Sequence, residues 1–172
     1  MVRALFPGTF DPIHFGHINI AERAARLFDE VIIAVYDKPL KSLLFSPDKR
    51  ISLVKETFKG HPKITVIGYS GLTVKACQEI NAQVIVRGLR VFSDFEFEFR
   101  MALANHRLAP DIESIALITD EEHTFLSSTT VREIAMLGGD VSSMVPKNVE
   151  KALIQSVSKM SDLQKPPNAL RD

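Results

Sequence analysis

Short apolar segments alternate with longer amphipathic ones along the chain. The apolar segments are rich in β-branched residues and continuously apolar, which is typical of strands buried on both faces of a parallel sheet. They lie at 2–6, 30–36, 63–69, 82–88 and 114–119. The alternation predicts a right-handed, doubly wound α/β fold, with a single Rossmann-like sheet of five parallel strands and flanking helices.

The residues between these segments carry helix signals. After the first predicted strand, apolar residues recur at helical spacing, at Ile18, Ala21, Ala25 and Phe28. The pair Ser46-Pro47 is typical of an N-cap followed by proline at the first helical position. It therefore predicts a helix that begins at Pro47.

Three further helices are predicted in the second half of the chain. Ser93 and Glu96 match a capping box, which would open a helix that continues to about Leu108. Shorter helices are expected over about 129–137 and 146–154. We predict one domain over residues 1–155 and a weakly ordered C-terminal tail over residues 156–172.

Composition and charge narrow the classes of function. Among 172 residues, 21 basic side chains balance 21 acidic ones, so we expect no nucleic-acid partner and only small anionic ligands. No apolar run approaches the roughly 18 residues that a membrane span needs, so we expect no membrane partner. The single cysteine, Cys77, excludes an internal disulfide and a cysteine metal cluster. A cytoplasmic protein is expected.

Five unusual stretches lie beyond the carboxyl ends of the predicted strands, where ligands bind in such a sheet. In chain order they are GTFDPIHFGH at 8–17, YDKPLKS at 36–42, YSGLT at 69–73, RGLR at 87–90 and the loop that leads into SSTTVR at 127–132. We expect these loops to converge on one edge of the sheet and to form an active site.

The stretch GTFDPIHFGH is suited to phosphate binding rather than to hydride transfer. It lacks the G-x-G-x-x-G spacing of a dinucleotide-binding loop. It offers the hydroxyl of Thr9, a helix start at Gly16 whose free N–H groups attract anions, and the donor side chain of His17. Two different interpretations stay open on these residues alone. His17 could be an ordinary capping residue, or His14, His17 and Asp11 could bind a metal.

Two of these stretches resemble known signatures. GTFDPIHFGH is similar to the (H/T)-x-G-H signature of the nucleotidylyltransferase superfamily, and SSTTVR resembles its second signature, S-S-T-x-x-R. RGLR, followed by DFEFE at 94–98, narrows the resemblance to the phosphopantetheine adenylyltransferase family, and further similarities extend from residue 2 to about 155. The resemblance implies transfer of the adenylyl group of ATP to 4′-phosphopantetheine, giving dephospho-coenzyme A and pyrophosphate.

The resemblance also implies a set of site residues. His17, Thr9 and Lys41 would be catalytic, and Thr9, Lys41, Thr73 and Arg87 would hold the acceptor. ATP would be bound by Thr9, Phe10, His17, Gly88, Leu89, Arg90, Glu98, His123, Thr124, Phe125, Leu126, Ser127, Ser128 and Thr129. The cofactor Mg²⁺ would be held mainly through the phosphate oxygens of ATP, so no metal site made of protein ligands is expected.

The same motifs leave three alternative functions open. His14-Phe15 departs from many relatives, which have Thr and a small polar residue there, and H-x-G-H also occurs in nicotinate or nicotinamide mononucleotide adenylyltransferases. The chain could also be a glycerol-phosphate cytidylyltransferase or a non-catalytic nucleotide-binding module. RGLR and DFEFE argue against the two enzymes. The joint presence of SSTTVR with His17, Lys41, Arg87 and Arg90 argues against the module. The resemblance further implies a homo-hexamer and feedback by coenzyme A.

Overall fold

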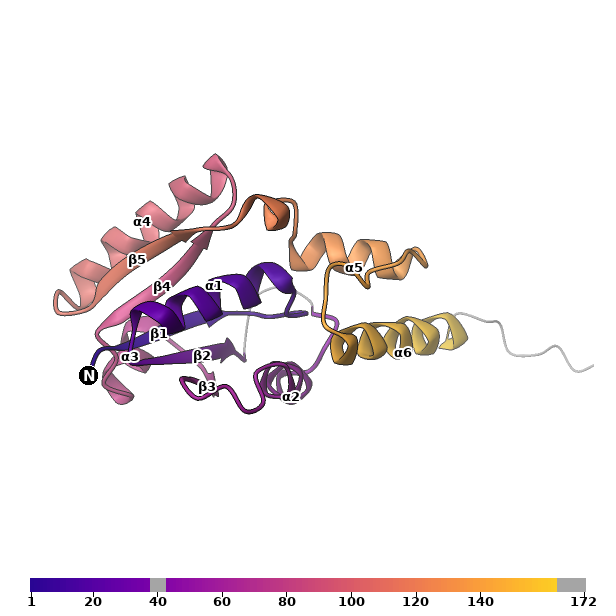
Figure 1. Ribbon diagram of the computed structural model, residues 1–172, viewed down its shortest axis with the longest axis horizontal. Coiled ribbons are helices and arrows are strands. Elements are labelled where there is room, and N and C mark those ends of the chain that lie inside the picture. The colour runs from indigo at the N-terminus through magenta and orange to yellow at the C-terminus, as the bar shows by residue number, and fades with distance from the viewer. Residues whose placement is uncertain (38–42, 164–172) are drawn as a thin grey trace, which may run out of the picture.

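The computed structural model describes residues 1–37 and 43–163, and its centre is a parallel sheet of five strands (Figure 1). The strands are β1 (Arg3–Gly8), β2 (Glu30–Tyr36), β3 (Ile64–Tyr69), β4 (Val84–Leu89) and β5 (Glu113–Ile118), in the spatial order β3-β2-β1-β4-β5. The predicted fold class, a single doubly wound Rossmann-like sheet of five parallel strands with flanking helices, is confirmed.

Helices connect the strands and follow the last one. They are α1 (Phe15–Leu27), α2 (Pro47–Thr57), α3 (Thr73–Glu79), α4 (Phe92–Leu108), α5 (Ser128–Met136) and α6 (Lys147–Leu163), and a short 3-10 turn spans Glu121–His123. None of the helices in the described part of the chain is long and apolar enough to cross a membrane.

The sheet has a hydrophobic core on each face, because successive side chains of a strand point to opposite sides. Ala4 and Phe6 of β1 belong to one core, which α1, α2, α5 and α6 cover. Leu5, between them in the sequence, belongs to the other core, together with Cys77 of α3. The central strands β1 and β2 are therefore buried on both faces, as their continuous apolar runs predicted, whereas the edge strands β3 and β5 are mostly half-buried or exposed.

Three helices differ from the sequence prediction by more than a residue. The Ser93–Glu96 capping box is wrong: α4 begins at Phe92 without a side-chain cap. With Val91 as the N-cap residue, Ser93 lies inside the first turn of the helix and cannot be its cap, and the carboxylate of Asp94 in the same turn binds the guanidinium of Arg90. The short helix α3 was not predicted. Helix α6 passes the expected end at 154 and runs to Leu163, inside the predicted tail.

The strand order places a topological switch beside β1, since β2 and β3 lie on one side of it and β4 and β5 on the other. β1 pairs with β2 as far as Gly8↔Val35, but with β4 only at Ala4↔Val84 and Leu5↔Ile85. The carboxyl ends of β1 and β4 therefore separate. In an open α/β sheet this is the position of the ligand crevice.

Candidate active site

Two adjoining cavities open where β1 and β4 separate. One has a volume of about 330 Å³ and the other about 380 Å³. The residues common to both walls are Pro7, Gly8, Thr9, Arg87 and Glu98. The site therefore has two compartments that meet at the end of β1.

The predicted site residues fall into three groups. The first cavity is lined by Thr9, Phe10, His17, Arg87, Gly88, Arg90, Glu98, Ser127, Ser128 and Thr129, and the second by Thr9, Thr73, Arg87 and Glu98. Leu89 and residues 123–126 do not line either cavity in the described structure. Lys41 lies outside the described residues.

The turn after β1 is shaped by close packing around Phe10. This residue has a φ of 50°, in the left-handed region, and its side chain is buried. Such a conformation costs about 1–3 kcal/mol unless packing compensates. The Phe10 ring makes edge contacts with Phe6 and His17, at centroid distances of 5.6 and 4.9 Å. A Cβ on Gly8 would lie 2.9 Å from the same ring, so a side chain at Gly8 would displace it.

The two histidines of the first motif are stacked at the start of α1. Their ring centroids lie 3.7 Å apart, and His14 is the N-cap residue of the helix. The backbone N–H of His14 donates to Nδ1 of His17 at 3.3 Å. A neutral His17 therefore carries its proton on Nε2, where it can be donated to a ligand. Gly16 accommodates this stack, because a Cβ there would lie 3.0 Å from Cε1 of His14.

Both imidazoles are held in the neutral form. Burial, together with the charges of Arg90 and His123, lowers the pKa of His14 from 6.5 to about 3. Burial and the neighbouring His14, Arg90 and Arg87 lower the pKa of His17 well below its ordinary value. Nδ1 of His14 is buried and has no hydrogen-bond partner among the described residues.

Two arginines from the end of β4 and the loop after it face the site, each in contact with a carboxylate of α4. Arg87 binds Glu98 through two bonds of 2.6 and 2.8 Å, and it also donates to the carbonyl of Pro7 at 2.6 Å. Arg90 binds Asp94 and donates to the carbonyl of Leu126 at 2.6 Å. The family resemblance places Arg87 and Glu98 on different substrates, whereas the structure pairs them. Arg87 uses three of its five N–H groups in these bonds, so donors remain for an anion.

The second motif caps α5 beside the first cavity. The hydroxyl of Ser127 accepts the amide of Thr130 at 3.0 Å, and that of Ser128 donates to the carbonyl of Pro12 at 2.9 Å. The segment thus combines helix capping with a position on the cavity wall. Helix N-termini with free N–H groups are suited to binding phosphate.

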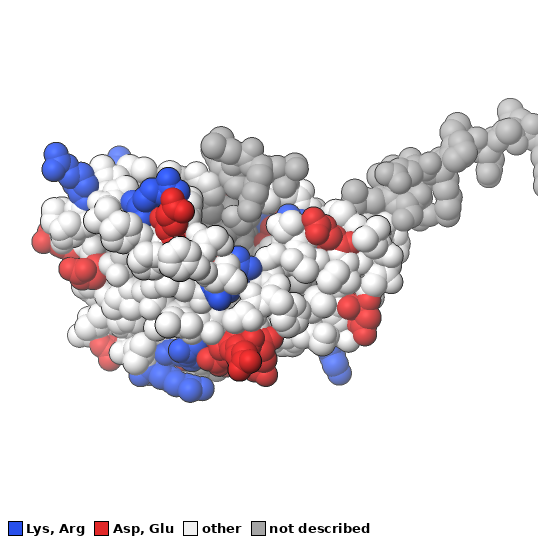
Figure 2. All heavy atoms as spheres, turned by 90° about the horizontal axis from the view of Figure 1, so that it is seen from above, with Lys and Arg blue, Asp and Glu red and all other residues white. Residues whose placement is uncertain are grey.

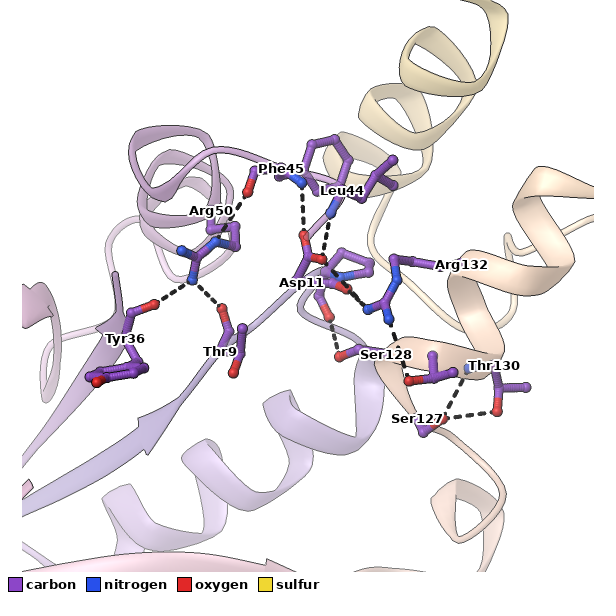
Figure 3. Close-up of polar contacts among 12 residues, drawn as sticks. Thr9, Asp11, Tyr36, Leu44, Phe45, Arg50, Ser127, Ser128, Thr130 and Arg132 are labelled. Atoms are coloured by element: carbon purple, nitrogen blue, oxygen red, sulfur yellow. Dashed lines mark hydrogen bonds and ion pairs between the residues drawn. The ribbon is translucent and has the colours of Figure 1, made fainter. Parts of the chain in front are cut away.

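The structural role of Asp11 (Figure 3) was not predicted from the sequence, where this residue was a possible metal ligand. Its buried carboxylate accepts the amides of Leu44 and Phe45 at 2.8 and 2.9 Å. The guanidinium of Arg132, at the end of SSTTVR, lies 3.6 Å from that carboxylate and donates to the Asp11 carbonyl. Asp11 thus connects both signature motifs to the segment before α2.

The second cavity contains residues to which sequence analysis assigned no role. Tyr36 and Tyr69 are paired across the ends of β2 and β3, with ring centroids 5.2 Å apart. The Tyr69 hydroxyl lies 3.2 Å from that of Thr73, and burial raises the pKa of Tyr69. Met101 and Asn105 contribute from α4. The signal in the sequence was that each tyrosine ends a predicted strand and begins one of the stretches expected to form the site, YDKPLKS or YSGLT.

Comparison with known proteins points to the same family that the sequence motifs resemble. A family model described as cytidylyltransferase-like matches residues 5–134. A protein from Roseiflexus castenholzii named phosphopantetheine adenylyltransferase is 51% identical over 153 residues, which are 89% of this chain and 96% of that protein. Proteins of the same name from Herpetosiphon aurantiacus and Carboxydothermus hydrogenoformans are 48% and 47% identical over 156 residues, covering 91% of this chain and 94% and 96% of theirs.

A solved structure shares the fold at much lower sequence identity. It is that of a candidate nicotinate-nucleotide adenylyltransferase from Vibrio parahaemolyticus, with a TM-score of 0.67 at 22% identity over 90% of this chain and 99% of the other. At this identity the likeness concerns architecture alone. The level and extent of identity to the curated relatives decide the family: the chain belongs to the phosphopantetheine adenylyltransferases, within the cytidylyltransferase-like group.

Proposed function

We propose that this protein transfers the adenylyl group of ATP to the phosphate of 4′-phosphopantetheine, giving dephospho-coenzyme A and pyrophosphate. The observation that carries this function is the pair of cavities that meet at Thr9, Arg87 and Glu98. A transfer between two bound substrates needs two compartments with a common boundary, where the attacking and transferred phosphates meet. The family to which the chain belongs supports the same pair of substrates.

On the acceptor side the nucleophile needs little activation. A phosphate monoester has a second pKa near 6 and is already largely dianionic at neutral pH. The chain must therefore hold and orient this phosphate, which we assign to the hydroxyl of Thr9 and the remaining donors of Arg87. The rest of the second cavity carries fewer charged side chains than the first. Its wall, with Tyr36, Tyr69 and Asn105, would hold the pantetheine arm. Fixing the attacking group in line supplies much of the rate enhancement.

On the nucleotide side the chain stabilises charge that develops during transfer. His17 would donate from Nε2 to an oxygen of the α-phosphate, and its neutral state suits a hydrogen-bond donor that keeps its proton. Arg90 and the start of α5, at Ser127–Thr129, would bind the other phosphates of ATP. No proton has to be removed from or returned to a protein group in this scheme.

Mg²⁺ is part of the proposal as a partner of ATP. Within the described residues, no group of three or more His, Cys, Asp or Glu side chains is arranged to hold a metal ion. Asp94 and Glu98, the carboxylates on the cavity wall, are paired with arginines. Phosphate oxygens would therefore supply most of the ligands, which agrees with the coordination habits of Mg²⁺. The ion would neutralise charge on the phosphates when bound.

The reaction is tested by incubating the protein with ATP, Mg²⁺ and 4′-phosphopantetheine and measuring pyrophosphate and dephospho-coenzyme A. We expect the two products in equal amounts. Parallel reactions replace the acceptor with nicotinate mononucleotide, nicotinamide mononucleotide or glycerol 3-phosphate, the last with CTP. Turnover of one of these without turnover of 4′-phosphopantetheine would refute the proposal. ATP binding without turnover of any acceptor would favour a non-catalytic module.

We propose that copies of the chain associate through α4, in agreement with the hexamer that the family resemblance implies. No residue of α4 is buried, and Phe92, Phe95 and Phe99 stack along it with exposures of 86%, 48% and 51%. Figure 2 looks onto the side where α4 and β5 lie, and much of this surface is uncharged. Exposed apolar patches of this kind mark interaction sites.

Light scattering on the full chain tests this assembly. We expect the mass of six chains for the wild type and a smaller species for Phe95→Asp, and a monomeric wild type would refute the proposal.

We further propose that coenzyme A inhibits the reaction, because coenzyme A shares the pantetheine arm and the adenylyl group with the substrates. We also propose a cytoplasmic location, which is consistent with the single cysteine, Cys77.

A further inference from the structure

The end of β1 is fixed by two guanidinium groups at the point where its strand pairing stops. On the β4 side, Arg87 donates to the carbonyl of Pro7. On the β2 side, the last paired residues are Gly8 and Val35, and Arg50 donates to the carbonyl of the next residue, Thr9. Arg87 lines both cavities and belongs to the proposed substrate machinery. Arg50 does not line either cavity in the described structure, so its role must be explained separately.

Arg50 extends the β1–β2 ladder by one step. It comes from α2, and its side chain is completely buried, the largest such side chain among the described residues. Its Nη1 atom donates to the carbonyls of Thr9 and Tyr36, both at 2.7 Å. These two residues directly follow the pair Gly8↔Val35, so one nitrogen joins the strands where backbone pairing has ended. Figure 3 shows the guanidinium between the two carbonyl groups.

The remaining donors of Arg50 hold the backbone around the same strand end. Nε lies 3.3 Å from the carbonyl of Phe45 and Nη2 lies 3.4 Å from that of Asp37. Burial lowers the pKa of the guanidinium, and the charges of Asp11 and Asp37 oppose that effect. A buried charge bound to neutral carbonyls is a costly way to obtain stability alone. The planar fork of arginine, however, fixes several acceptors in one geometry.

We propose that Arg50 is a positioning residue for the transfer reaction: it sets the place of Thr9 at the boundary of the two cavities and of Tyr36 in the second one. This inference rests on the proposed function. Tyr36 lines only the cavity assigned to the acceptor, whereas His17, Arg90 and the start of α5 line only the nucleotide cavity. Loss of the Arg50 fork therefore acts on acceptor binding and on the chemical step more than on ATP binding.

The test compares Arg50→Lys with Leu53→Ala. Lysine keeps the charge but lacks the fork. Leu53 is a buried residue of the same helix that contacts no substrate cavity in the described structure, so it controls for destabilisation of α2. The measurements are kcat, KM for 4′-phosphopantetheine, and Kd for ATP by calorimetry. For Arg50→Lys we expect kcat to fall by about 10- to 100-fold, as for a small misplacement of reacting groups, and KM for the acceptor to rise.

The Kd for ATP should change by less than about two-fold, because the groups assigned to ATP binding alone do not contact Arg50. Leu53→Ala should keep wild-type values of all three constants despite a lower melting temperature. Equal kinetic constants in Arg50→Lys and wild type would overturn the role of Arg50, as would parallel losses in both variants. A wild type that binds ATP but does not convert 4′-phosphopantetheine would instead overturn the proposed function, and this inference with it.

Discussion

At the scale of single residues, His17 is the side chain on which the proposed chemistry depends most. Its Nδ1 accepts the amide of His14, which leaves Nε2 as the donor to a phosphate. We expect His17→Ala to lower kcat by about 10²-fold or more, the effect of removing one transition-state donor. Steady-state kinetics measures the loss, and circular dichroism checks that the variant is folded. Nearly full activity in a folded His17→Ala protein would show that His17 has another role.

The stacked pair His14 and His17 leads to a second prediction, which concerns the protonation of both rings in the ligand-free protein. Because burial holds both pKa values below 6.5, both imidazoles should stay neutral at about pH 5.5. Nitrogen-15 chemical shifts of the rings report protonation directly, and His14→Thr and His17→Asn assign the signals. We expect the Nε2–H tautomer for His17 throughout. A titration of either ring with a midpoint near 6.5 would contradict the neutral pair.

At the scale of elements, Asp11 connects α5 to the segment before α2. Its carboxylate is buried and lies beside Arg132 from α5. Asp11→Asn keeps the shape but removes the charge, and breaking a buried pair of this kind costs about 3–5 kcal/mol. Since Arg132 is partly exposed, we expect the lower end of that range. Urea denaturation of Asp11→Asn, Arg132→Met and the double variant measures the coupling. Strictly additive effects would show that the two residues act independently.

Strands were better predicted than helix starts, for a physical reason. A strand buried on both faces must be apolar throughout, and all five strands coincide with such runs. A cap needs only a local hydrogen bond, which a neighbour can replace. Ser46 accepts the amide of Lys49 as expected. At Ser93 the expected box fails, because α4 begins at Phe92 and Ser93 lies inside its first turn. Helix α3 is short and lacks a side-chain cap, so little in its sequence marked it.

The site was predictable where chemistry is concentrated in short motifs. The first and second signatures and RGLR do meet at one edge of the sheet, because parallel strands end together there. Asp11, Arg50 and Arg132 were missed as a network, since their partners are mostly backbone groups far away in the chain. A sequence shows which side chains can donate or accept, but the fold decides which backbone atoms they reach.

At the scale of the whole molecule, the neutral histidine pair makes stability depend on pH. The unfolded chain binds protons at His14 and His17 below about pH 6.5, whereas the folded chain keeps both rings neutral to lower pH. The unfolded state is therefore favoured as the pH falls, by about 1.4 kcal/mol per histidine for each pH unit below 6.5. The two histidines therefore leave the free energy of unfolding unchanged above about pH 6.5 and lower it progressively below that pH.

Between about pH 7.5 and 5.5 the pair should lower the free energy of unfolding by about 3 kcal/mol in total. Urea denaturation at the two pH values, at one fixed protein concentration, measures the change. The double variant His14→Thr/His17→Asn is the control, because its carboxylates and remaining histidines titrate as in the wild type. We expect its stability to fall less over the same interval, by a difference of about 3 kcal/mol. Equal losses in both proteins would mean that different groups cause the pH dependence, and that the active-site imidazoles are not held neutral by the fold.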